Sequence, residues 1–362
     1  MPPCTPYAGD SENPSLRQLS GQLRTVVAPA QIPPNLPLAA ARFRSFLLRA
    51  NYLTANFERG RQMKRLLSTV LVLALTGATR ADEIRTPIPP SVISDPVADA
   101  VHPPRSAQVL VPSHGMGMNA LFYLAAGTGS HPTMVLLHGF PGNEQNLDLA
   151  QAIRRAGWNV LTLHYRGSWG SPGIFSIGHV LEDTDAAITF VRRPDIAEKF
   201  GIDTRRIVLG GHSMGGFSSA SHARRDERLL GVVLIDAWNV GATRREFARV
   251  NGAARAELVA KQFDDLGNSL RGATAESTAE EIMAHGTDWD FESWAKDLTH
   301  TPLLVIGASK AYGDENRQLA EAVTRAGGRV TAVTLPSDHN FQDRRIALAA
   351  EVVNWLMKLP GL

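Results

Sequence analysis

The sequence VLGGHSMGGF, residues 208–217, places one serine between two pairs of glycines directly after an apolar run. The run RIVLGG (206–211) predicts a buried strand, and the residues after Met214 predict a helix. GHSMG (211–215) is therefore G-x-S-x-G at a strand-to-helix junction, where the motif forms a sharp turn that presents a nucleophilic serine. Its two glycines leave room for neighbouring backbone to pass close by. We expect Ser213 to be that nucleophile, at a helix N-terminus whose dipole and free amides favour developing negative charge.

Strand-like and helix-like segments alternate from about residue 107 onward. After an antiparallel opening pair, the strands are rich in Val, Ile and Leu and are separated by helices, which indicates a parallel sheet covered on both faces. The predicted fold class is α/β, with a mostly parallel eight-stranded sheet. The expected strands are 107–111, 118–125, 134–139, 159–165, 206–211, 231–236, 302–308 and 330–336, and the expected helices are 143–156, 182–191, the segment after Met214, 316–325 and 343–358.

One interval, about 239–299, interrupts this alternation with some sixty residues of mostly helix-forming sequence. Connections of that length in a compact domain usually form a structure of their own, so we expect a helical lid at the carboxyl edge of the sheet. Trp289, Phe291 and Trp294 could form an apolar pocket wall there, or could simply pack the lid onto the body. Trp169 and Trp238, which follow expected strands, are further candidate substrate-binding residues, together with Trp289.

A serine hydroxyl is a weak nucleophile and needs a general base. The chain has eleven histidines, and His339 in LPSDHNF is the candidate because it lies between the last expected strand and the last expected helix. That position brings it above the sheet edge, near Ser213. His212 directly precedes the serine, and we expect it to point away and to serve packing.

The tetrahedral intermediate of acyl transfer also needs two hydrogen-bond donors for its oxyanion. LHGFPG (137–142) follows the strand MVLL, and the backbone N–H of Phe140 together with that of Met214 could provide them. The alternative role of Pro141 and Gly142 is a tight turn into the next helix.

The order of elements, together with HGFPG, GHSMGG and DHNF, resembles the α/β-hydrolase superfamily over roughly residues 105–360. YRGSWGSPG (165–173) is similar to the dienelactone-hydrolase and prolyl-oligopeptidase-like branch, without a propeller domain. The resemblance implies Ser213 as nucleophile, His339 as general base and acid, and Phe140 and Met214 as oxyanion donors.

The acid of the expected triad departs from the family pattern. Family members usually carry Asp or Glu shortly after the seventh strand, where this chain has Lys310. We take Asp314 as the acid, although it could instead cap the following helix. Asp236, at the tip of the sixth strand, and Glu315 remain alternatives.

A second segment bears on location. Met63-Lys64-Arg65 precedes a short apolar run and small residues ending at Ala81, as in a secretory signal peptide. We therefore expect residues 1–62 to be an upstream extension, 63–81 an export signal and 82–362 the catalytic domain. The protein is then secreted or periplasmic if Met63 is the true start, and cytoplasmic otherwise.

The charge of the chain depends on that leader. Residues 1–81 hold ten of the 37 Lys and Arg and three of the 35 Asp and Glu, so the remainder carries 27 basic and 32 acidic residues. The sequence contains no basic patch with interleaved aromatic residues that would indicate nucleic-acid binding. We expect no membrane span, because the apolar run is too short. The oligomeric state cannot be deduced.

These features predict a serine hydrolase of small-molecule carboxylic esters that needs neither metal nor organic cofactor. A prolyl-oligopeptidase-like peptidase or amidase is the alternative within enzymes. A noncatalytic binding protein with the same fold, and acyl transfer to an alcohol other than water, are further possibilities.

Overall fold

A computed structural model describes residues 86–263, 266 and 269–360 of the chain. The predicted extension (1–62) and the predicted export signal (63–81) lie outside these residues, and both stay predictions.

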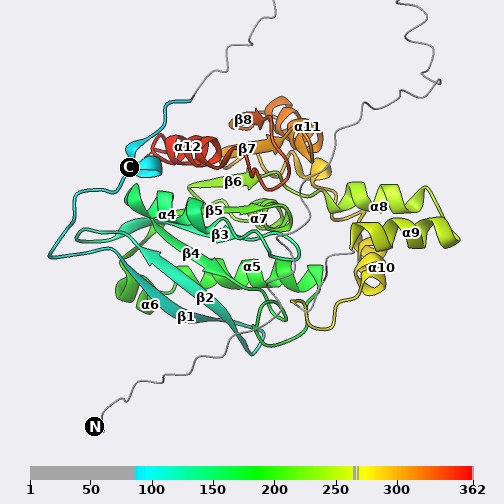
Figure 1. Ribbon diagram of the computed structural model, residues 1–362, viewed down its shortest axis with the longest axis horizontal. Coiled ribbons are helices and arrows are strands. Elements are labelled where there is room, and N and C mark those ends of the chain that lie inside the picture. The colour runs from blue at the N-terminus through cyan, green and yellow to red at the C-terminus, as the bar shows by residue number, and fades with distance from the viewer. Residues whose placement is uncertain (1–85, 264–265, 267–268, 361–362) are drawn as a thin grey trace, which may run out of the picture. The chain divides into compact units, whose positions relative to one another are not determined.

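The centre of the fold is an eight-stranded sheet in the order β1-β2-β4-β3-β5-β6-β7-β8 (Figure 1). β2 runs antiparallel to both β1 and β4, and the pairs from β4 through β8 are parallel. The predicted antiparallel opening pair and the predicted mostly parallel sheet are thus confirmed. The strands are β1 (Arg105–Ser113), β2 (Met116–Leu124), β3 (His131–Leu137), β4 (Asn159–Leu163), β5 (Ile202–His212), β6 (Gly231–Ile235), β7 (Leu303–Ala308) and β8 (Val330–Leu335).

Alternate side chains of each buried strand point to opposite faces of the sheet, and here both sets are apolar. Helices therefore cover both faces. In β3, Met134 packs with α4 and α12, whereas Val135 belongs to the core on the side of α5 and α7. β5 repeats the pattern with Val208 and Leu209. The helices outside the β6–β7 connection are α3 (Pro90–Ile93), α4 (Leu147–Arg155), α5 (Ile177–Val191), α6 (Pro194–Phe200), α7 (Met214–Ala223), α11 (Gly313–Arg325) and α12 (Arg345–Leu356).

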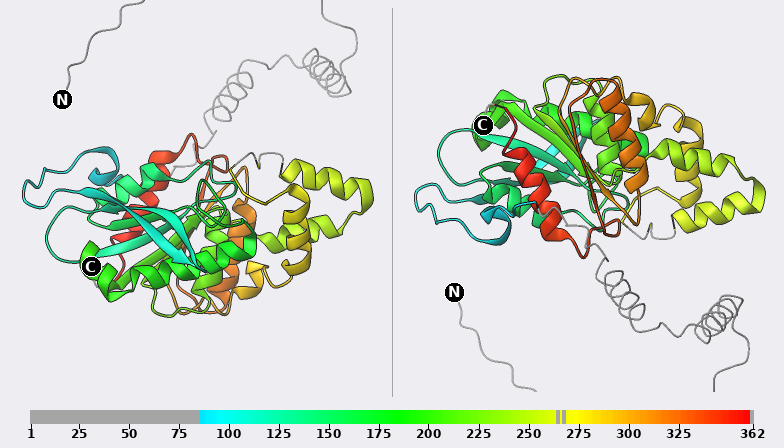
Figure 2. Two further views of the ribbon diagram at one scale, coloured as in Figure 1. Left: turned by 90° about the horizontal axis from the view of Figure 1, so that it is seen from below. Right: turned by 90° about the horizontal axis from the view of Figure 1, so that it is seen from above.

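The long connection between β6 and β7 is helical, as the sequence indicates. It contains α8 (Val240–Ala248), α9 (Gly252–Gln262), α10 (Ala275–His285) and the 3-10 helix η2 (Phe291–Trp294). Figures 1 and 2 show α8, α9 and α10 projecting beyond the sheet, at the end opposite the C-terminus. This insertion also touches the loop after β4, since the N–H of Trp169 donates to the Ser269 carbonyl (2.9 Å) and Ser168 forms a β-bridge with Leu270.

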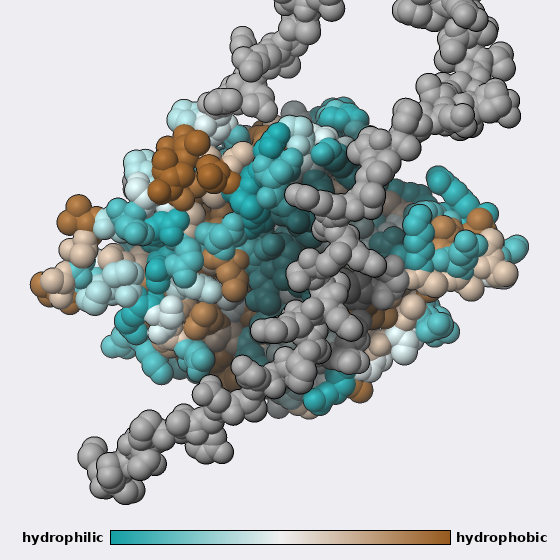
Figure 3. All heavy atoms as spheres, in the orientation of Figure 1, coloured by the Kyte–Doolittle hydropathy of each residue, from teal (hydrophilic) through white to brown (hydrophobic). Residues whose placement is uncertain are grey.

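The surface seen in Figure 3 is mostly hydrophilic over the described residues, with apolar side chains in separate groups. Exposed apolar side chains include Val97 and Val101 in the segment before β1. Within residues 86–360, leaving aside the gaps at 264–265 and 267–268, no helix has the length and apolar character needed to cross a membrane.

Candidate active site

The predicted sharp turn around Ser213 is present. β5 ends at His212 and α7 begins at Met214, so Ser213 is the single residue between strand and helix. Its backbone has φ 55° and ψ −118°, a strained conformation for a residue with a side chain. The Ser213 N–H donates to the Ile235 carbonyl (2.9 Å) and its carbonyl accepts from the Trp238 N–H (3.0 Å). The turn is thereby fixed to the end of β6.

The two glycines of the motif have no room for a side chain. A Cβ on Gly211 would lie 2.4 Å from the carbonyl carbon of Gly215, and a Cβ on Gly215 would lie 2.4 Å from the Leu137 carbonyl oxygen. The start of α7 therefore passes directly against the end of β3. Only glycine at both positions permits this approach.

The loop after β3, HGFPG, lies beside the serine. A Cβ on Gly139 would lie 2.8 Å from Ser213 Cβ, so the peptide that precedes Phe140 approaches Ser213 closely. Tyr165 steadies this loop, because its hydroxyl donates to the His138 carbonyl (3.1 Å). Met214 is the first residue of α7, where backbone amides lack partners inside the helix. The two predicted oxyanion donors thus belong to segments that flank Ser213.

The acid partner of His339 is Asp236. His339 Nδ1 lies 2.6 Å from Asp236 Oδ2. Asp236 follows β6 with φ 42° and is fully buried, and it also accepts from the N–H groups of Ala308 (2.8 Å) and Tyr312 (3.3 Å). The backbone turn after β7, where the family usually places the acid, donates to the acid from β6 instead.

The structure brings Asp236, and not the predicted acid Asp314, to His339 Nδ1. The Asp314 side chain is 84% exposed in the first turn of α11, and it forms an ion pair with Arg317 (3.2 Å). Because Asp236 is the partner of His339 Nδ1, the alternative acid Glu315 does not occupy this position either. The sequence does carry a signal for Asp236. This carboxylate directly follows the apolar strand GVVLI, and a charge buried there needs hydrogen-bond partners.

Buried histidines surround the turn. His212 does not merely pack, because its Nε2 lies 2.8 Å from the His339 carbonyl oxygen and the two ring centroids are 4.4 Å apart. Burial lowers the pKa of His138 to about 4, and burial together with the adjacent His339 lowers the pKa of His212 to about 3. Both rings are therefore neutral near pH 7.

The three predicted substrate-binding tryptophans occupy different places. Trp238 is buried beside the turn at Ser213, and its ring centroid lies 6.3 Å from that of Phe140. Trp169 is 39% exposed, and its Nε1 donates to the Pro141 carbonyl (2.9 Å). Trp289 packs against Phe217 of α7 (6.1 Å), so it contributes to holding the insertion on the body.

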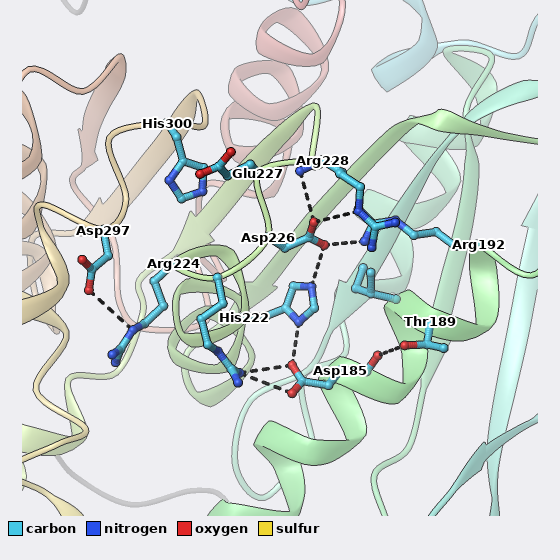
Figure 4. Close-up of a pocket in the computed structure, with 12 residues that line it drawn as sticks. Asp185, Thr189, Arg192, His222, Arg224, Asp226, Glu227, Arg228, Asp297 and His300 are labelled. Atoms are coloured by element: carbon cyan, nitrogen blue, oxygen red, sulfur yellow. Dashed lines mark hydrogen bonds and ion pairs between the residues drawn. The ribbon is translucent and has the colours of Figure 1, made fainter.

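A separate cavity of about 660 Å³ lies between the ends of α5 and α7 (Figure 4). His222 lies on its wall with Nδ1 2.6 Å from Asp185 and Nε2 3.0 Å from Asp226. Asp226 also pairs with Arg192. Burial alone would raise the pKa of Asp226, but hydrogen bonds from Arg192 and His222 lower it to about 2. Asp185 in turn pairs with Arg225, so each carboxylate of the cluster has an arginine partner, as in a structural ion-pair network.

No group of three or more His, Cys, Asp and Glu residues suited to a metal ion occurs in the described part of the chain. A strained serine, a histidine–carboxylate pair and free amides at a helix N-terminus are the components of acyl transfer through a serine nucleophile.

Comparison with known proteins agrees with the fold. The family model described as "Alpha/beta hydrolase family" matches residues 134–351. The chain belongs to the α/β-hydrolase family. Among curated proteins, it is similar to an Escherichia coli protein named "Uncharacterized 31.7 kDa protein in traX-finO intergenic region", at 32% identity over 122 residues. That match covers 32% of this chain and 41% of the relative, so the chain spans about two fifths of the relative's length.

Solved structures share the same fold at low sequence identity. An esterase from Pyrobaculum calidifontis superposes with a TM-score of 0.54 at 20% identity, covering 71% of this chain and 87% of that one. One of two fungal esterases from Rhizomucor miehei gives a TM-score of 0.51 at 17% identity, covering 71% of this chain and 84% of that one. Both likenesses concern the fold alone.

Proposed function

We propose that this protein is a serine hydrolase that cleaves carboxylic esters through an acyl-enzyme intermediate. The observation that carries the proposal is the 2.6 Å bond between His339 Nδ1 and Asp236, formed beside a serine held in a strained turn at the start of α7. The named esterases among the structural neighbours are in keeping with it.

The proposed mechanism follows from the hydrogen bond of His339. Because a carboxylate only accepts, Nδ1 carries the proton and Nε2 is free to act as base. Nε2 takes the proton of Ser213 as its oxygen attacks the ester carbonyl carbon. The imidazolium is stabilised by Asp236 and returns the proton to the leaving alcohol. Water then attacks the acyl-enzyme by the same route and releases the carboxylic acid.

The oxyanion of each tetrahedral intermediate would accept hydrogen bonds from the backbone N–H groups of Phe140 and Met214. Such donors stabilise the charge without reorganising during the reaction. The close approach of Gly139 to Ser213 supports this assignment for the loop after β3. This mechanism uses no metal and no organic cofactor.

The aromatic side chains around Phe140 favour an apolar substrate of modest size. The ring centroid of Phe140 lies 5.6 Å from that of Phe263, 5.7 Å from that of Phe175 and 6.3 Å from that of Trp238. Phe263 follows α9, so the helical insertion contributes to this apolar wall. We propose that it acts as a lid over acyl or aryl groups, with Trp169 at the edge of the same site.

The proposal is tested by assaying the wild type and Ser213→Ala on p-nitrophenyl esters of increasing acyl length and on aminoacyl p-nitroanilides. We expect turnover of acetate and butyrate esters, no turnover of anilides, and loss of turnover in Ser213→Ala. Preferred cleavage of anilides would indicate a peptidase or amidase instead. Absence of turnover on both substrate classes, with no labelling by a fluorophosphonate, would indicate a noncatalytic protein.

Product analysis with competing alcohols separates hydrolysis from acyl transfer. Hydrolysis predicts free acid as the main product, whereas a dominant new ester would assign the protein as an acyltransferase.

A further inference from the structure

His212 occupies the junction of three loops that carry the proposed machinery. It is the last residue of β5, its side chain is buried, and its Nε2 lies 2.8 Å from the backbone carbonyl oxygen of His339. A carbonyl only accepts, so Nε2 carries the hydrogen and Nδ1 is unprotonated in the neutral ring.

The other edge of the ring faces the loop after β3. A Cβ on Gly139 would lie 3.2 Å from His212 Nδ1 and 2.8 Å from Ser213 Cβ. His212 Nδ1 is buried without a hydrogen-bond partner among the described residues. The His212 imidazole ring therefore fills the space between the loop after β3 and the loop that carries His339.

The surroundings of His212 disfavour a positive charge. Burial comes first and the adjacent His339 second, with Arg345 and His138 adding to the effect, so the pKa of His212 is lowered to about 3. A neutral ring 4.4 Å from His339 adds no repulsion when His339 gains its proton.

We propose that His212 is a positioning residue, which holds the main chain of His339 against the nucleophile turn through its Nε2–H. The inference rests on the proposed function of Ser213 and His339. Because the bond goes to the backbone of His339, its side chain remains free to bond to Asp236 and to receive the serine proton. Arg345 donates from Nη1 to the next carbonyl, that of Asn340 (3.0 Å), so two consecutive carbonyls of this loop are each held by a side chain.

His212→Phe and His212→Gln form the decisive pair of variants. Phe keeps an aromatic ring but has no donor, whereas the Gln side-chain amide can donate from near the position of Nε2. We expect kcat on p-nitrophenyl butyrate to fall by about 10- to 100-fold in His212→Phe, with KM within about threefold, because small displacements of a catalytic group cost this much. His212→Gln should keep kcat within about threefold of wild type. If His212→Phe does not fold, His212→Leu carries the same expectation.

The matched control is His300→Phe. His300 Nε2 lies 2.9 Å from the Ala223 carbonyl oxygen, the same kind of contact at the far end of α7 from Ser213. We expect its kcat to equal that of the wild type. An equal loss in this variant would indicate a general structural effect and would contradict the positioning role.

Hydrogen exchange measures the loop without requiring activity. The N–H groups of Phe341 and Gln342 donate to Asp338 within the loop (both 3.0 Å). We expect their exchange to quicken about tenfold in His212→Phe and to return toward wild type in His212→Gln. Unchanged exchange and unchanged kcat in His212→Phe, or a Gln variant as impaired as the Phe variant, would overturn the inference. If the wild type turns over no substrate while the variants still show this exchange pattern, the result would count against the proposed function alone.

Discussion

Asp236 Oδ2 lies 2.6 Å from His339 Nδ1, although 103 residues separate the two along the chain. The pair forms because the carboxyl ends of β6 and β8 meet at one edge of the sheet, on either side of β7. Ser213 follows β5, the other neighbour of β6, and its N–H is bonded to the carbonyl of the residue before Asp236. Parallel strands thus bring the loops that carry Ser213, Asp236 and His339 to one edge of the sheet.

The identity of the acid gives the first prediction. Asp236→Asn cannot stabilise an imidazolium or fix the correct tautomer, so kcat/KM on p-nitrophenyl butyrate should fall on the order of 10³- to 10⁴-fold. Asp314→Asn should stay within about twofold of wild type, because Asp314 is exposed and bonded to Arg317. Circular dichroism of both variants checks the fold. A larger loss in the Asp314 variant would show that Asp236 is not the acid.

A second prediction concerns the space around the nucleophile turn. Gly211→Ala would bring its Cβ to 2.4 Å from the backbone of Gly215, so the free energy of unfolding should fall by about 3 kcal/mol or more. Gly157→Ala serves as the control, since its Cβ meets nothing within 4 Å and only its φ of 92° is unfavourable. Urea denaturation monitored by tryptophan fluorescence measures both. Equal losses would mean that the backbone relaxes around the added Cβ at position 211, and would contradict the steric account.

The neutral His212 ring gives a third prediction, on pH. An imidazole titrates near 6.5 in the unfolded chain, and the pKa of His212 in the fold is lowered to about 3. Between these values only the unfolded chain binds the proton, so this contribution to stability is present above pH 6.5 and is lost as the pH falls. His212→Gln should therefore flatten the pH dependence of the unfolding free energy between pH 4 and 6, by up to about 1.4 kcal/mol per pH unit. An unchanged slope would mean that His212 is protonated in the fold.

The ion-pair network in Figure 4 gives a fourth prediction. His222 bonds to Asp185 and to the nearly buried Asp226, so His222→Phe should lower the unfolding free energy by about 1–3 kcal/mol. Ester hydrolysis should be unaffected, because nine residues of helix place His222 roughly 13 Å along α7 from Ser213. Thermal unfolding and kcat, measured on the same preparation, check both parts. A variant with normal stability but lost activity would give this cavity a role in the reaction.

The architecture was predictable from sequence because its signals are local. Apolar strands such as RIVLGG and GVVLI, separated by helices, indicate a parallel sheet, and the glycines around Ser213 indicate the turn. The acid was not predictable in this way. Asp236 and Asp314 both follow strands, and only the three-dimensional fold shows that the turn after β7 directs its amides to Asp236.

The role of His212 was equally hidden. Its position beside Ser213 indicates only that its side chain points away from that of the serine. Its partner is a carbonyl 127 residues further on, and a backbone atom leaves no signal in the sequence. Contacts between a side chain and a distant main chain depend on the packing of loops, which local patterns do not specify.

The central claim is that Ser213 is the nucleophile, and peptide mass spectrometry after treatment with a fluorophosphonate tests it most directly. The account predicts one phosphonyl adduct on the peptide that contains Ser213, no adduct in Ser213→Ala, and slow labelling in Asp236→Asn. An adduct on another residue, or none on the folded wild type, would contradict it.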